Sequence, residues 1–76
     1  MLRKRLVVQL SESYESVMKL LLLAKQGRLT LKEASLKANE GVIIADLVFE
    51  GPPEKIQWFM LKTSGSPYVL ECKKIE

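Results

Sequence analysis

Two stretches of this chain alternate apolar and polar residues with the period of two that is typical of β-strands. In residues 2–10, four apolar side chains share one face, and only Lys4 interrupts them. In residues 42–49, both faces are largely apolar, which is typical of a strand in the centre of a sheet. The pattern therefore predicts two strands, the second of them internal.

A helical period of three to four residues follows the first strand and recurs after the second. In the first helix, Lys25, Gly27 and Arg28 act as stop signals. Its inward stripe is predicted to consist of Tyr14, Val17, Met18, Leu21, Leu22 and Ala24. In the second helix, Pro52 and Pro53 suit the first turn. Its inward residues are predicted to be Ile56, Phe59, Met60 and Thr63.

Residues 29–39 allow two interpretations. Thr30 and Glu33 form a capping box, which favours a helix. The same residues contain two alternating runs whose phase shifts once, as a strand with a β-bulge would produce. The strand is favoured because Asn39, Glu40 and Gly41 then form a hairpin turn into the strand that follows.

With a last strand over residues 68–75, the order is strand, helix, strand, strand, helix, strand. This order predicts a single α+β domain over residues 1–76, with the ferredoxin-like βαββαβ sandwich. In that fold, a four-stranded antiparallel sheet carries both helices on one face.

Composition excludes several kinds of chemistry. The chain has no histidine and a single cysteine, Cys72, so imidazole-based catalysis and multi-cysteine zinc sites are excluded. We expect no catalytic residues, no metal and no cofactor. No apolar run is long enough to span a bilayer, and residues 1–10 lack the features of a signal peptide, so we expect a cytoplasmic protein without a membrane association.

The formal charge of +3 comes mainly from the two ends of the chain. Arg3, Arg5, Lys73 and Lys74 at predicted strand ends leave open an alternative function, an adaptor that binds protein or nucleic acid. The central strands carry no aromatic residue except Phe49, on the helix-facing side, which argues against RNA recognition by base stacking.

The face of the sheet away from the helices is predicted to be unusually apolar. It would carry Arg5, Val7, Gln9, Val42, Ile44, Asp46, Val48, Val69 and Glu71. We expect a partner protein to cover Val7, Ile44 and Val48. Asp46 is expected to pair with Arg5 across neighbouring strands, with a ligand contact as the alternative.

Trp58 and Leu61 lie opposite the inward stripe of the second helix. Tryptophan is enriched at binding hot spots, so both residues are candidates for a docking surface. In the other interpretation, a loop or the C-terminal residues of the chain itself cover them. Leu23 of the first helix is likewise expected to be exposed.

The stretch "LSESY" connects the first strand to the first helix and also allows two interpretations. Ser11 or Ser13 can cap the helix, while Leu10, Ser11, Glu12, Ser13 and Tyr14 together form a candidate ligand-binding loop. A helix N-terminus attracts carboxylates, but Glu12 and Glu15 already lie there and would repel one.

Along its whole length the chain resembles an ACT domain, most closely that of the small regulatory subunit of acetolactate synthase. The resemblance rests on "KQG" at the end of the first helix, on a turn into "VIIADLVFEG", and on a second helix followed by "SPYVLEC". It implies a non-catalytic regulatory domain that forms a homodimer or higher oligomer. It also implies a catalytic subunit as partner and a branched-chain amino acid as ligand.

One departure from the ACT pattern concerns the loop itself. Such domains commonly place an Asp or Asn and then a glycine in the loop between the first strand and first helix. In this chain no glycine precedes Gly27. The helix cap and the amino-acid site therefore both stay open as roles of this loop.

Overall fold

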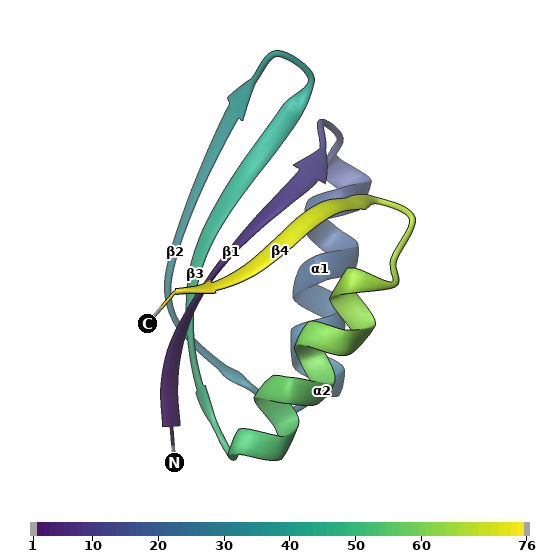
Figure 1. Cartoon of the computed structure of the whole chain (residues 1–76). Helices are drawn as coiled ribbons and strands as arrows, with labels where there is room; N and C mark the ends of the chain where they lie inside the picture. The colour runs from purple at the N-terminus through teal and green to yellow at the C-terminus, as the bar shows by residue number, and fades with distance from the viewer. Residues whose placement is uncertain (1, 76) are drawn as a thin grey trace.

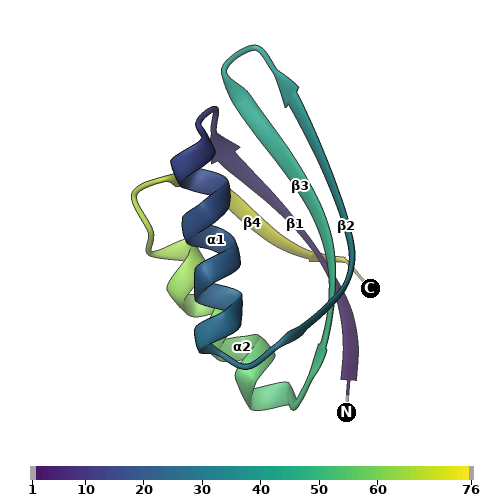
Figure 2. The ribbon, with the colours of Figure 1, turned by 180° about the vertical axis from the view of Figure 1, so that it is seen from behind.

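The computed structural model describes residues 2–75 and contains four strands and two helices in the predicted order (Figure 1). The elements are β1 (Leu2–Ser11), α1 (Tyr14–Gln26), β2 (Thr30–Asn39), β3 (Val42–Gly51), α2 (Pro53–Ser64) and β4 (Val69–Ile75). The strands form one antiparallel sheet in the order β2-β3-β1-β4. Both helices cover the same face of this sheet (Figure 2). The prediction of a ferredoxin-like sandwich is confirmed.

The uncertain segment, residues 29–39, is a bulged strand. Leu31 pairs with Phe49 and Glu33 pairs with Val48, so Lys32 is the extra residue of a β-bulge. A two-residue turn then leads into β3, and both Glu40 and Gly41 have positive φ, as a tight hairpin turn requires. The single phase shift in the sequence was therefore a correct sign of the bulge.

The core lies between the helices and the two central strands, β1 and β3. Its residues are Leu6, Val8, Leu10, Leu20, Ala24, Leu29, Ala45, Leu47, Phe49, Ile56 and Phe59. The alternating patterns of β1 and β3 thus correctly predicted which face is buried. On α2, Ile56, Phe59 and Thr63 are buried as predicted, and Met60 is half-buried.

The predicted inward stripe of α1 was largely wrong. Ser16, Leu20 and Ala24 face the core, whereas Tyr14, Met18, Leu21 and Leu22 are exposed. Leu23 is half-buried against the core instead of exposed. Apolar residues cover more than half of the circumference of this helix, so their spacing did not determine which of them would face the sheet.

A register shift also changes the prediction for β4. Gln9 pairs with Glu71 but Leu10 pairs with Val69, so Leu70 is an unpaired residue. The shift places Val69 against the core, not on the open face, and Glu71 stays on the open face with Gln9. Within residues 2–75, no helix is long and apolar enough to cross a membrane.

Candidate functional site

The loop between β1 and α1 is attached to the β2–β3 hairpin by a reciprocal pair of hydrogen bonds. The Glu12 N–H donates to the carbonyl oxygen of Gly41 at 3.1 Å. In return, the Gly41 N–H donates to Oε1 of Glu12 at 3.0 Å. The Glu12 carboxylate therefore fixes the position of the hairpin turn relative to the loop.

Ser13 is the N-cap of α1. Its backbone is extended and its Oγ accepts from the Ser16 N–H at 3.1 Å. The loop is further held by the Ser13 N–H, which donates to the Ser11 carbonyl, and by the Ser11 N–H, which donates to the Tyr68 carbonyl. The helix-cap interpretation of the loop is confirmed, and Ser13 rather than Ser11 is the cap. The cap uses the third amide of α1, which leaves those of Tyr14 and Glu15 for water or a ligand.

The loop also forms one wall of a pocket of about 490 Å³, whose lining residues are Glu12, Ser13, Tyr14, Ala38 and Ile43. Three of the five candidate loop residues thus meet the edge hairpin at one site, and the volume lies in the range of small-molecule pockets. Tyr14 is 91% exposed, so its ring forms an open rim.

The other two candidate residues lie elsewhere. Leu10 is part of the core. Ser11 lines a smaller pocket of about 300 Å³ on the far side of the loop, where Lys19 and Tyr68 also lie. The sequence did not point to Ala38, Ile43 or Gly41 as partners of the loop, because only the hairpin brings them there.

Charge in the larger pocket is one-sided. Glu12 is its only charged lining residue among those described, and Glu15 lies one turn of the helix away on the smaller pocket. The pocket therefore offers a carboxylate to a cationic group, and it lies at the N-terminus of α1, where the helix dipole favours an anionic group. The cross-strand pair Ala38 and Ile43 forms its apolar wall.

An exposed apolar edge adjoins this pocket. Every residue of β2 is exposed, including Leu31 and Leu36 on the helix-facing side. On α1, Met18 is 67% exposed and Leu21 is also exposed. Figure 2 shows β2 at one edge of the sheet, with β3 as its neighbouring strand. Residues of the mispredicted stripe of α1 are thus exposed on the same side of the sheet as Leu31 and Leu36 of β2.

The open face of the sheet carries the predicted apolar candidates and an ion pair. Val7 and Val48 are half-buried and Ile44 is exposed. Nε of Arg5 donates to Oδ1 of Asp46 at 2.8 Å, and Nη2 of Arg5 contacts Oδ2, so the expected cross-strand pair is confirmed. The hydrogen bond from Arg5 lowers the pKa of the Asp46 carboxyl from its usual value.

This ion pair predicts a specific acid dependence of stability. A carboxyl whose pKa is lower in the folded state stabilises the fold fully above its unfolded-state pKa of about 3.9. That contribution is lost as the pH falls through the lower folded-state pKa. Asp46→Asn should therefore flatten the acid end of a urea-unfolding series measured against pH, and Arg5→Gln should flatten it similarly. Glu40→Gln, at the hairpin turn, is the matched control and should retain the parent profile.

The two candidate docking residues on α2, Trp58 and Leu61, differ in how much of each side chain is exposed. Leu61 is 69% exposed, as expected. Trp58 is half-buried: it packs against the core, and its ring also lies against Gly27 at the end of α1. The expectation of an exposed tryptophan was wrong, and the chain itself covers much of this side chain.

Carboxylates contact basic residues that were considered for nucleic-acid binding. Arg3 contacts Glu50 at 3.4 Å, Arg5 pairs with Asp46, and Lys73 contacts Glu71 at 3.7 Å. These pairs weaken the positive field at the strand ends. Within residues 2–75, no group of three or more histidine, cysteine or acidic residues could hold a metal ion.

No protein-family model and no curated protein matches the chain. Solved structures with the same fold do. The ACT domain of GTP pyrophosphokinase from Chlorobium tepidum has a TM-score of 0.80 at 12% identity, with 96% of each chain covered. The C-terminal domain of the MgtC protein from Mycobacterium tuberculosis has a TM-score of 0.71 at 14% identity, covering 96% of this chain and 84% of that one.

A third similar structure is much longer than this chain. Homoserine dehydrogenase from Thiobacillus denitrificans has a TM-score of 0.77 at 9% identity, covering 97% of this chain and 17% of that one. At these identities the likeness concerns the fold. The chain therefore has the ferredoxin-like fold of an ACT domain, with the β1–α1 loop and the β2–β3 hairpin together forming its candidate site.

Proposed function

We propose that this chain is a non-catalytic regulatory domain that senses a small amino acid at the β1–α1 loop. The observation that carries the proposal is the pocket between Glu12, Ser13 and Tyr14 on one side and Ala38 and Ile43 on the other. The resemblance of the whole sequence to ACT domains supports it, as does the fold shared with the ACT domain of GTP pyrophosphokinase.

The pocket suits the three parts of an apolar amino acid. The carboxylate binds at the Tyr14 amide, the first of α1, where the positive end of the helix dipole lies. The ammonium group faces the Glu12 carboxylate, whose Oε1 also accepts from Gly41. A branched aliphatic side chain packs against Ala38 and Ile43. Gly41 supplies, from the hairpin, a glycine beside a loop that has none of its own.

A second copy of the chain completes the site. β2 is an edge strand, so the backbone groups on its outer side can pair with another strand. Its helix-facing side carries Leu31 and Leu36, and Met18 and Leu21 of α1 are exposed on the same face of the sheet. We infer pairing of two copies along β2, which buries this surface and closes the open rim of the pocket at Tyr14.

The open face of the sheet is then left for an enzyme. Val7, Ile44 and Val48 lie there between charged residues, an arrangement suited to a partner that covers an apolar centre and contacts a polar rim. We propose the catalytic chain of an amino-acid biosynthetic enzyme, such as acetolactate synthase, as that partner. The occurrence of this fold as a small part of a homoserine dehydrogenase supports a regulatory attachment to metabolic enzymes.

The proposal is tested by thermal unfolding with and without millimolar valine, leucine or isoleucine, with light scattering on the same sample. A ligand that binds only the folded state must raise the melting temperature, because at 100 times its Kd it adds about 2.7 kcal/mol to the free energy of unfolding. We expect a rise with at least one of the three in a sample with the mass of a dimer. No rise with any of them contradicts the amino-acid site, and a monomeric mass contradicts the pairing along β2.

Two matched variants locate the site. Glu12→Gln keeps an oxygen that can accept from Gly41 but removes the charge that faces the ligand ammonium, so it should abolish the rise and leave the mass unchanged. Glu15→Gln removes the same charge from a side chain in the first turn of α1 that lines the smaller pocket and not this one, and it should respond as the parent does. Equal effects of the two variants would contradict the proposed ligand position.

A further inference from the structure

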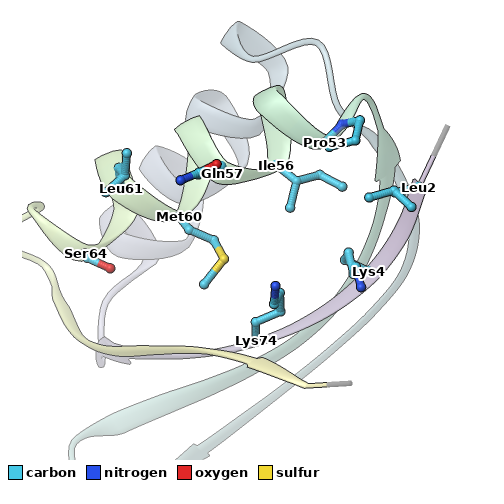
Figure 3. A pocket seen from close by; sticks show the side chains of 9 residues that line it. All are labelled: Leu2, Lys4, Pro53, Ile56, Gln57, Met60, Leu61, Ser64 and Lys74. Carbon is cyan, nitrogen blue, oxygen red and sulfur yellow. The ribbon is translucent and has the colours of Figure 1, made fainter.

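The two edges of the sheet differ in what their helix-facing sides carry. At the β4 edge, Lys74 pairs with Leu6, whose side chain is in the core, so Lys74 lies on the helix-facing side. Figure 3 shows its amine directed from β4 toward α2, where Lys74 lines a pocket of about 510 Å³. An inward-pointing charge protects an edge strand, because a strand added beside it would hinder the hydration of that charge.

Within residues 33–39, the helix-facing side of the β2 edge is wholly apolar. Its residues are Ala34, Leu36 and Ala38, which pair with Leu47, Ala45 and Ile43 of β3. All three are exposed. The β2 edge therefore presents apolar side chains that a further strand would bury, and the β4 edge presents a lysine.

The open-face side of the same segment carries two opposite charges. The bulge at Lys32 sets the phase of the strand, so that Glu33 pairs with Val48 on the open face. Lys37 pairs with Ile44 and lies on the same face. Glu33 and Lys37 are each two residues from Ser35, in opposite directions along β2. Opposite charges placed symmetrically about one residue are self-complementary when a second copy of the strand runs antiparallel.

We propose that two copies of the chain pair antiparallel about a twofold axis that passes through Ser35, perpendicular to the sheet. In this register, Glu33 of each copy lies opposite Lys37 of the other, on the open face. Ala34 of each copy lies opposite Leu36 of the other, so a small side chain meets a large one on the helix-facing side. This register specifies the pairing along β2 proposed above and rests on it.

Other registers lose the two ion pairs. An axis at Leu36 places Glu33 opposite Asn39. The same axis places Lys37 opposite Ser35, so neither charge meets one of opposite sign. An axis at Glu33 or at Lys37 sets like charges directly opposite each other, which destabilises a strand pair. Electrostatic complementarity therefore selects the axis at Ser35.

The same register brings the second copy to the candidate amino-acid pocket. Ala38 lines that pocket. With the axis at Ser35, the residue opposite Ala38 is Lys32 of the second copy, which is the extra residue of its β-bulge. The bulge of each copy thus borders the pocket of the other, so pairing and ligand site adjoin.

Two charge reversals test the register, with the dissociation constant of the dimer measured by analytical ultracentrifugation at low salt. In Glu33→Lys, both ion pairs become contacts between two cations, and in Lys37→Glu both become contacts between two anions. Each variant alone should raise the dissociation constant about tenfold or more. An equimolar mixture of the two variants should form a heterodimer with nearly the parent affinity, because opposite charges meet again.

A charge reversal at the other edge is the matched control. Lys73→Glu changes the open face of β4, where Lys73 contacts Glu71 of its own chain, and should keep the parent dissociation constant. High salt should reduce the difference between the parent and the two β2 variants, because exposed ion pairs are screened. Circular dichroism of each variant establishes that it is folded.

Three results would overturn the register: β2 variants that keep the parent dissociation constant, a mixture no tighter than either variant alone, or equal weakening by Lys73→Glu. A monomeric parent contradicts the pairing along β2 as well. A dimeric parent that ignores the charge reversals contradicts the register alone. The valine-dependent rise in melting temperature is a separate measurement, so failure of the amino-acid site is distinguishable from failure of the register.

Discussion

Replacing Phe49 by alanine is expected to lower the free energy of unfolding by about 3–5 kcal/mol. Phe49 lies on the central strand β3, is 0% exposed, and packs edge-to-face against Phe59 with ring centroids 5.0 Å apart. A domain of this size has a total stability of roughly 4–11 kcal/mol. The substitution should therefore leave a large share of the molecules unfolded at 37 °C, as measured by circular dichroism during urea unfolding.

Two further variants test whether the loss of stability comes from the buried position and the ring contact of Phe49. Phe49→Leu keeps most of the apolar volume but removes the ring contact with Phe59, so it should cost clearly less than Phe49→Ala. Leu70→Ala truncates an unpaired residue of β4 that is 58% exposed and should change the free energy of unfolding by at most about 0.5 kcal/mol. If Phe49→Ala cost no more than Leu70→Ala, the core described above would be wrong.

Replacing Gly27 by alanine is expected to destabilise the fold by about 1–3 kcal/mol, although an added methyl group is usually tolerated at a helix end. Gly27 has φ of −79°, so its backbone does not require glycine. A Cβ at this position would lie 2.7 Å from Cζ3 and 3.0 Å from Cε3 of Trp58. The indole ring would have to leave its place against the core, and chemical denaturation measures the cost.

Gly65 provides the matched control for this prediction. It caps α2 as Gly27 caps α1, with φ of −89°, but a Cβ there meets no atom closer than 3.6 Å. Gly65→Ala should be neutral or slightly stabilising, because alanine reduces the entropy of the unfolded chain. Trp58→Leu, combined with Gly27→Ala, should recover part of the loss, and additive costs would contradict the close packing of Trp58 on Gly27.

Much of the fold was predictable from local patterns. A period of two identified the buried faces of β1 and β3, and one shift of phase identified the bulge in β2. Prolines and glycines correctly marked the ends of α2 and the hairpin turn. Each of these signals depends on residues within a few positions of one another, where backbone geometry alone determines the spacing.

The candidate site was predictable only in part. The serines of the loop predicted a helix cap, and the hydrogen bond from the Ser16 N–H to Oγ of Ser13 confirms it. Glu12 and Gly41 are 29 positions apart, however, and their reciprocal hydrogen bonds exist only because the hairpin lies beside the loop.

The sequence by itself therefore determined the order and type of the elements, the buried faces of the central strands, and the absence of imidazole and multi-cysteine chemistry. Only the tertiary structure decided which side of α1 faces the sheet, how much of Trp58 is covered, and that the β2–β3 hairpin forms a pocket with the loop. The physical reason is that periodicity describes one element at a time. Whether a residue of that element is buried or lines a pocket depends on how far the neighbouring elements extend over it.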